Sequence, residues 1–184
     1  MKKRALIILA DGFEDIEAVT PVDILRRINV EVTVAGLSEG IVKGARGIAI
    51  KVDRALSDTD NSCDVVILLG GMPGAENLAS SSKVKKIVLE MFEKGKLIAA
   101  ICASPALVLA PLGILSGKKA TCFTGMEENF PVSVKFSKDP VVQDGNIITS
   151  RGPATAFAFS LKIAENLVGK DMAEMVAKQT LYLA

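Results

Sequence analysis

The chain has 184 residues and a formal net charge of +1, from 22 lysines and arginines against 21 aspartates and glutamates. This balance gives no indication of a nucleic-acid partner or an anionic membrane surface. The chain contains no histidine, which excludes Ser-His-Asp and Cys-His catalysis and a histidine-ligated zinc site. Any chemistry must therefore use carboxylates, thiols, amines or backbone dipoles.

Length and cysteine content predict one cytoplasmic domain spanning residues 1–184, at roughly 150 residues per domain. The three cysteines are odd in number and widely spaced, and the N-terminus lacks a signal-peptide pattern. These features predict a reducing compartment without a disulfide framework. No apolar run approaches the roughly 18 residues of a membrane span, so no membrane association is expected.

Four short apolar runs, at residues 5–10, 32–35, 65–69 and 97–102, predict strands. The runs are continuous rather than alternating, which is typical of strands buried on both faces of a parallel sheet.

Helical patterns lie between the predicted strands. Apolar spacing predicts helices over 16–28, 84–92 and 156–168, the first kinked or broken at Pro21 and the others ended by Gly95 and Gly169. Residues 141–148 indicate a hairpin with an Asp-Gly turn. The alternation predicts an α/β three-layer sandwich with a mostly parallel sheet.

Cys102 follows a buried strand, and Ser104-Pro105 after it is typical of a helix N-cap and first helical position. This strand-to-helix turn resembles a nucleophile elbow with a thiol in place of the hydroxyl. A helix N-terminus lowers the pKa of a thiol and favours the reactive thiolate. The alternative is that Cys102 is a small buried hydrophobe.

Two further loops follow predicted strands. The backbone N–H groups of Gly70 and Gly71 are candidates for an oxyanion or phosphate cradle, although a plain tight turn is the alternative. In the loop at 11–17, Asp11, Glu14 and Asp15 are expected to be solvated, whereas Glu17 is expected to point inward with a raised pKa. Sequence alone does not place Glu17 beside Cys102.

The other two cysteines, Cys63 and Cys122, are predicted to pack in the core, since isolated cysteines without histidine make a weak metal site. The glycine spacing matches neither a dinucleotide fingerprint nor a P-loop. No metal and no organic cofactor is therefore expected.

Seven segments resemble the ThiJ/PfpI superfamily, in particular its DJ-type branch of small cysteine proteins. They are RALIILA (4–10), FEDIEA (13–18), PVDILRR (21–27), VTVAG (32–36), LGG (69–71), AAICASP (99–105) and TSRGPAT (149–155). The resemblance implies a flavodoxin-like homodimer paired around its first helix, and an oxidation-prone nucleophile at Cys102 hydrogen-bonded to a protonated Glu17. It also implies an oxyanion site at the N–H groups of Gly71 and Ala103.

The resemblance further implies arginines around the pocket at Arg46 and Arg151, with Arg27 a third candidate. Two departures matter. The protease-like members carry histidine where this chain has Ala103, which argues against a peptidase, and many close relatives carry a histidine where Phe123 stands here.

Residues and resemblance together predict a glyoxalase or deglycase acting on 2-oxoaldehydes such as methylglyoxal and glyoxal, without glutathione or a cofactor, and protecting against oxidative stress. Cys102 is expected to attack the aldehyde, and Glu17 to move a proton between the adjacent carbons. The alternative is a non-enzymatic redox sensor or stress chaperone in which Cys102 is oxidised to a sulfinate.

Overall fold

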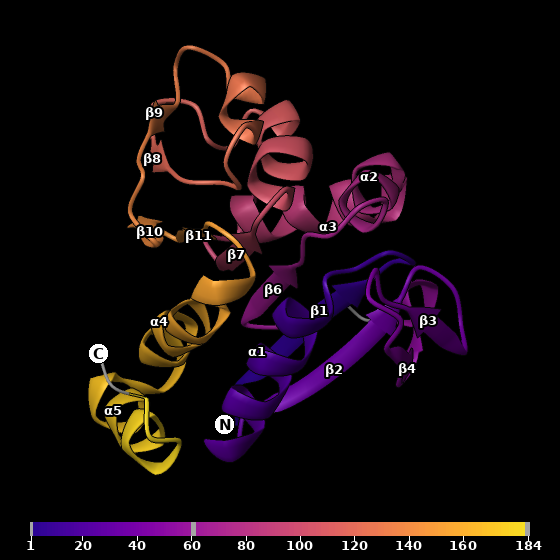
Figure 1. Cartoon of the computed structure of the whole chain (residues 1–184), viewed down its shortest axis with the longest axis vertical. Helices are drawn as coiled ribbons and strands as arrows, with labels where there is room; N and C mark the ends of the chain where they lie inside the picture. Colours follow the sequence, from indigo (N-terminus) through magenta and orange to yellow (C-terminus); the bar gives the residue numbers. More distant parts are fainter. Residues whose placement is uncertain (1, 60–61, 183–184) are drawn as a thin grey trace.

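The computed structural model describes residues 2–59 and 62–182, and a seven-stranded sheet forms their centre (Figure 1). Its strand order is β10-β11-β7-β6-β1-β2-β5, and every neighbouring pair is parallel except β10 with β11. The strands are β1 (Arg4–Leu9), β2 (Glu31–Gly36), β5 (Arg54–Ala55), β6 (Val65–Leu68), β7 (Leu97–Ile101), β10 (Val141–Asp144) and β11 (Ile147–Ser150). The predicted α/β class with a mostly parallel sheet is confirmed.

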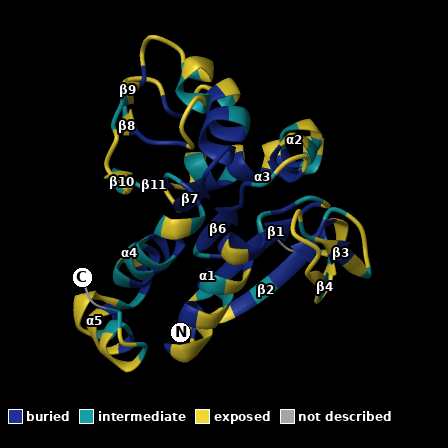
Figure 2. Ribbon diagram, viewed as in Figure 1, coloured by how far each residue is buried: buried dark blue, intermediate teal, exposed yellow. Residues whose placement is uncertain are grey.

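Helices cover both faces of this sheet. One face packs against α1 (Asp15–Arg27), α4 (Ala156–Val168) and α5 (Lys170–Gln179), and the other against α2 (Gly74–Ser80) and α3 (Ser82–Glu93). Alternate side chains of β1 enter the two cores, with Ile7 in the first and Ile8 in the second. Figure 2 shows the sheet as a buried layer between the helices. Burial on both faces explains why the strand sequences are continuously apolar.

The predicted helices 84–92 and 156–168 and the hairpin at 141–148 are confirmed. The Ser81 side chain caps α3 by accepting a hydrogen bond from the Val84 N–H, and Gly95 follows it with a φ of +62°. Helix α1 continues through Pro21, which therefore does not break it.

Several short elements were not predicted. Besides α2, α5 and β5, they are β3 (Ile41–Lys43), β4 (Ala49–Lys51), β8 (Lys119–Ala120), β9 (Lys135–Phe136) and the short helical turns Leu56–Asp58, Ala110–Leu112, Met126–Asn129 and Pro153–Thr155. Strands β3 and β4 form an antiparallel hairpin whose tip spans residues 44–48. These segments are too short for a hydrophobic period to mark them.

The strand order reverses at β1. The chain passes from β1 to β2 on one side, and β6 then lies on the other side of β1. Loops leaving two such neighbouring strands diverge, and ligands of open α/β sheets bind in the crevice between them. A functional site is therefore expected among the loops that follow β1, β6 and β7.

Asp15 is only 3% exposed, which corrects the prediction that it is a solvated first-turn residue. Its carboxylate accepts hydrogen bonds from the N–H groups of Arg46 at 2.9 Å and Ile48 at 2.8 Å. Gly44 lies so close that a Cβ there would approach the carboxylate to 2.5 Å. Asp15 thereby fastens the tip of the β3–β4 hairpin to the start of α1.

Replacing Asp15 by alanine is expected to lower the free energy of unfolding by about 3 kcal/mol, because two part-buried, charge-assisted hydrogen bonds to backbone N–H groups are lost. Urea unfolding followed by circular dichroism measures this. The matched control is Asp23→Ala, which removes an exposed ion pair to Arg27 on the same helix and should cost about 0.5 kcal/mol. Equal losses in the two variants would contradict the fastening role.

Candidate active site

Cys102 occupies a strained turn directly after β7. Its φ is +65°, a left-handed conformation that is uncommon for a residue with a side chain. The turn is held because the Cys102 N–H donates to the Ser150 carbonyl at the end of β11, at 2.9 Å. The residue is 8% exposed. This geometry is that of a nucleophile elbow, as the sequence predicts.

Ser104 does not act as an N-cap, which corrects the prediction. Its backbone is already helical, with φ −64° and ψ −34°, and no side-chain cap bond forms. The hydroxyl instead donates to the Leu69 carbonyl at the end of β6. The chain continues from Ser104 into a π-helical turn, Pro105–Leu109, rather than a regular α-helix. Ser104 thus joins the ends of β6 and β7.

Glu17 lies on the inward face of the first turn of α1 and is completely buried, as predicted. Its Oε2 accepts a hydrogen bond from the Gly70 N–H at 2.8 Å. Burial raises the pKa of Glu17 to about 7, while the hydrogen bonds from Gly70 and Cys102 oppose the rise. This carboxyl group can therefore exchange a proton near neutral pH.

The contact between Glu17 and Cys102 also affects the pKa of the thiol. Burial and the neighbouring Glu17 carboxylate raise the pKa of Cys102 to about 12, opposed by hydrogen bonds from the N–H groups of Gly71 and Ala103. The prediction of a lowered thiol pKa is therefore wrong, because burial of the thiol outweighs the N–H groups that face it and Glu17 adds to the rise. When Glu17 is protonated, the charge repulsion is absent and the carboxylic acid becomes a donor toward sulfur. The two groups titrate as a pair.

Gly70 and Gly71 allow this close packing in different ways. A Cβ on Gly70 would lie 2.7 Å from the Cys102 sulfur and 2.9 Å from Glu17 Oε2. Gly71 has a φ of +86°, and a Cβ there would come within 2.4 Å of the Glu14 nitrogen. The Gly70 N–H is directed at Glu17, so of the two predicted cradle donors only Gly71 is directed at sulfur.

The three predicted arginines have different positions. One Nη of Arg151 donates to Thr124 Oγ1, the guanidinium lies 6.0 Å from the Phe136 ring centre, and Nη1 is buried with no hydrogen-bond partner among the described residues. Arg46 is exposed at the tip of the β3–β4 hairpin. Arg27 pairs with Asp23 in the last turns of α1, at the opposite end of that helix from Glu17.

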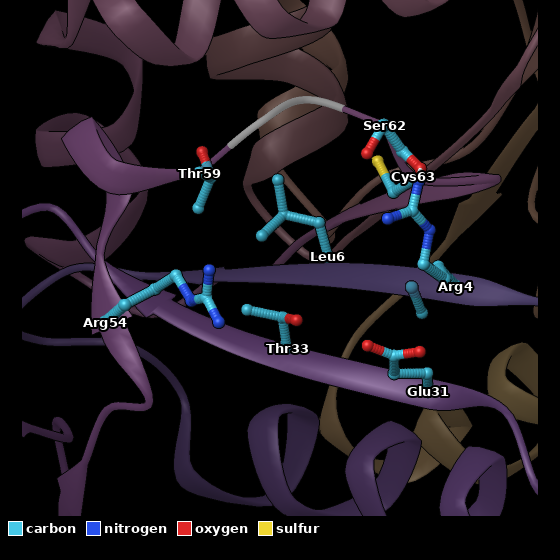
Figure 3. Close-up of a pocket in the computed structure, with 9 residues that line it drawn as sticks. Arg4, Leu6, Glu31, Thr33, Arg54, Thr59, Ser62 and Cys63 are labelled. Atoms are coloured by element: carbon cyan, nitrogen blue, oxygen red, sulfur yellow. Dashed lines mark hydrogen bonds between the residues drawn. The ribbon is translucent and has the colours of Figure 1, made fainter.

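The other two cysteines are buried, as predicted. Burial raises the pKa of Cys122 to about 12 and that of Cys63 to about 11. Cys63 borders a pocket of about 90 Å³ over β1 and β2 (Figure 3), and its sulfur lies 3.8 Å from the Met91 sulfur. This pocket includes the first residues of β1 and β2, Arg4 and Glu31, so it lies away from the strand ends that carry Cys102.

Two contacts of the site were not predicted. The Cys102 carbonyl accepts a hydrogen bond from the Phe123 N–H at 2.8 Å, and Asp15 holds the hairpin that carries Arg46. Neither contact has a signal in the sequence, because both join segments that are distant along the chain.

Within the described ranges no three cysteine or acidic side chains are grouped as metal ligands. No helix in that part of the chain has the length and apolar character needed to cross a membrane.

The chain matches known proteins along nearly its whole length. The model of the DJ-1/PfpI family matches residues 3–166. Protein dj-1beta of Drosophila melanogaster is 45% identical over 184 residues, covering 98% of each chain. The glutathione-independent glyoxalase DJR-1.2 of Caenorhabditis elegans is 36% identical over 178 residues, covering 96% of this chain and 95% of that protein.

Solved structures of relatives are also similar to this chain along nearly its whole length. Oxidized Toxoplasma gondii DJ-1 matches with a TM-score of 0.95 at 38% identity, covering 99% of this chain and 100% of that one. Drosophila melanogaster DJ-1beta matches with a TM-score of 0.93 at 43% identity, covering 100% of both.

Proposed function

The chain belongs to the DJ-1/PfpI family, and we propose that it is a cysteine-dependent glyoxalase or deglycase-like enzyme that converts 2-oxoaldehydes to 2-hydroxy acids. The carrying observation is the buried pair of Glu17 and Cys102 packed around Gly70. A relative named as a glutathione-independent glyoxalase supports this chemistry. Methylglyoxal and glyoxal are the proposed substrates, and neither glutathione nor a cofactor takes part.

The first step is addition of the thiol to the aldehyde. The Cys102 sulfur forms a bond to the aldehyde carbon as its proton passes to Glu17, and the carbonyl oxygen becomes an alkoxide. The N–H groups of Gly71 and Ala103, which hydrogen-bond the sulfur in the free chain, are the proposed donors to this oxygen. Glu17 then returns the proton to the alkoxide, which leaves a neutral hemithioacetal and an ionised carboxylate.

The second step moves hydrogen between the two carbons. The Glu17 carboxylate removes the proton from the carbon bonded to sulfur, and an enediolate forms with the neighbouring carbonyl. The hydroxyl proton passes to the second oxygen, and Glu17 returns its proton to the second carbon. The first carbon is thereby oxidised to a thioester and the second reduced to an alcohol, so no external oxidant is needed.

Water completes the reaction by hydrolysing the thioester, which releases the 2-hydroxy acid and restores the thiol. The direct test is lactate formation from methylglyoxal by the purified chain in buffer free of glutathione. Turnover no faster than the buffer rate would reject the proposed enzyme.

A redox sensor or stress chaperone is the second candidate. The donors around the Cys102 sulfur would equally hold a sulfinate, and one structure that this chain resembles is that of an oxidized relative. Mass spectrometry after mild peroxide separates the two candidates. Two added oxygens at Cys102 without lactate formation would favour the sensor.

We also propose a homodimer formed around α1. Ile16 and Val19 on this helix are 56% and 47% exposed, and Ile41 and Ile48 of the β3–β4 hairpin are 64% and 48% exposed. A largely apolar groove of about 150 Å³ separates α1 from β4. A second copy would cover this surface, as the family resemblance implies.

Sedimentation at micromolar concentration is expected to give twice the chain mass, and Val19→Glu to give the chain mass, because a charge would be buried at the interface. A wild-type monomer would overturn the dimer.

A further inference from the structure

Phe123 ends a segment that is anchored against the sheet. The two residues before it, Thr121 and Cys122, are completely buried, and the Thr121 N–H donates to Thr149 Oγ1 of β11 at 3.0 Å. The Phe123 N–H then donates to the carbonyl of Cys102 at 2.8 Å. The backbone of Phe123 is thus bonded directly to that of the nucleophile.

The ring of Phe123 packs against a defined segment of backbone. A Cβ built on Gly152 would lie 3.2 Å from Phe123 Cδ2 and 3.6 Å from Cε2, so the ring lies against the backbone just after β11. The residue is nevertheless 46% exposed. Since the Cys102 N–H is bonded to Ser150 at the end of β11, ring and thiol occupy the same edge of the sheet.

We infer that Phe123 is a specificity-determining residue whose ring receives the substituent of the 2-oxoaldehyde, so that the chain prefers substrates with an aryl or large apolar substituent. The backbone bond to Cys102 sets the position of the ring relative to the reacting sulfur. The ring is half-exposed, so an apolar substituent that packs on it removes apolar surface of both the ring and the substituent from water. This inference rests on the proposed function.

The test compares kcat/KM for phenylglyoxal and methylglyoxal. The wild-type ratio is expected to favour phenylglyoxal, and Phe123→Ala is expected to lower the ratio about tenfold, the order of one lost aromatic contact with its buried area. Phe123→Leu should retain part of the preference. Leu89→Ala, which truncates an exposed hydrophobic residue on α3, is the control and should leave the ratio unchanged.

Gly152→Ala probes the same contact from the opposite side. The φ of Gly152 is 165°, which alanine also adopts, and the added methyl group, 3.2 Å from Phe123 Cδ2, would shift the ring by a few tenths of an ångström. The ratio is expected to fall through a higher KM for phenylglyoxal, with kcat/KM for methylglyoxal nearly unchanged. An unchanged ratio in both Phe123→Ala and Gly152→Ala would overturn the inference while leaving the proposed function intact.

Product binding supplies a readout that does not depend on turnover. Mandelate is the 2-hydroxy acid formed from phenylglyoxal, as lactate is from methylglyoxal. Calorimetry on the Cys102→Ser chain is expected to show tighter binding of mandelate than of lactate, and Phe123→Ala in that background should remove the difference. Equal affinities for the two acids would overturn the inference. Phe123→Ala could instead change the sedimentation of the chain without changing the kcat/KM ratio or the relative affinities for the two acids. That result would assign the ring to a contact between chains, and would also overturn the inference.

Discussion

Replacing Cys102 by serine is expected to lower lactate formation from methylglyoxal by at least about a thousandfold, because a serine hydroxyl in a site without histidine has no base strong enough to activate it. The substitution changes one atom, and the turn at φ +65° is held by backbone bonds that serine also makes. A rate defect with an unchanged midpoint of thermal unfolding would therefore report on chemistry. Enzymatic lactate determination measures the loss.

Cys63→Ser is the matched control for this substitution. Cys63 is also buried, but it lines the pocket in Figure 3, and its sulfur lies 3.8 Å from that of Met91. Its activity is expected to stay within about twofold of the wild type, since that sulfur touches no group of the site. If Cys102→Ser retained wild-type activity, the proposed nucleophile would be wrong.

Replacing Glu17 by glutamine is expected to reduce kcat by about a hundredfold to ten-thousandfold, the usual contribution of a general acid–base group. Glutamine can still accept the Gly70 N–H through its oxygen, so the loop should keep its geometry. Proton abstraction from carbon requires the ionised carboxylate. The wild-type rate should therefore rise with pH through about 7, the pKa of Glu17, and the rise should be absent in the variant.

The same substitution is expected to change stability in the opposite direction. The pKa of Glu17 rises from 4.5 to about 7 on folding, so the folded state binds the proton more tightly than the unfolded state. Stability is therefore full below pH 4.5 and is lost as pH rises toward about 7. Above that range Glu17→Gln should be more stable than the wild type, by up to about 3 kcal/mol.

Urea unfolding at pH 5 and pH 8 measures this difference. Glu128→Gln, at an exposed position, is the control and should follow the wild type at both pH values. A Glu17→Gln chain less stable than the wild type at pH 8 would contradict a buried carboxylate. Loss of activity together with gain of stability would support a group retained for chemistry rather than for folding.

The strands were predictable because their surroundings are uniform. Ile7 and Ile8 enter opposite cores and Ala99 and Ala100 are buried on opposite faces of β7, so each strand must be apolar throughout. The β3–β4 hairpin has no such pattern, and its attachment depends on Asp15, whose local sequence is typical of a solvated first turn. Prediction from the local sequence was therefore wrong where a polar side chain forms hydrogen bonds to a segment that is distant along the chain.

Ser104 illustrates the same competition. Ser-Pro is typical of a helix start, but the hydroxyl is buried beside β6 and donates to the Leu69 carbonyl instead. A buried carbonyl left without a donor costs more than an uncapped turn, so the tertiary contact prevails.

The sequence by itself determined the α/β class, the candidate residues Cys102 and Glu17, and, through the absence of histidine, the kind of chemistry that they can perform. Only the tertiary structure decided that the two side chains meet, because a parallel sheet brings its strand ends together regardless of their separation along the chain. It also decided that Gly70 holds Glu17 while Gly71 faces sulfur, and that Glu17 titrates near neutrality. Both result from burial, since the loss of water around a charge depends on packing and not on the local sequence.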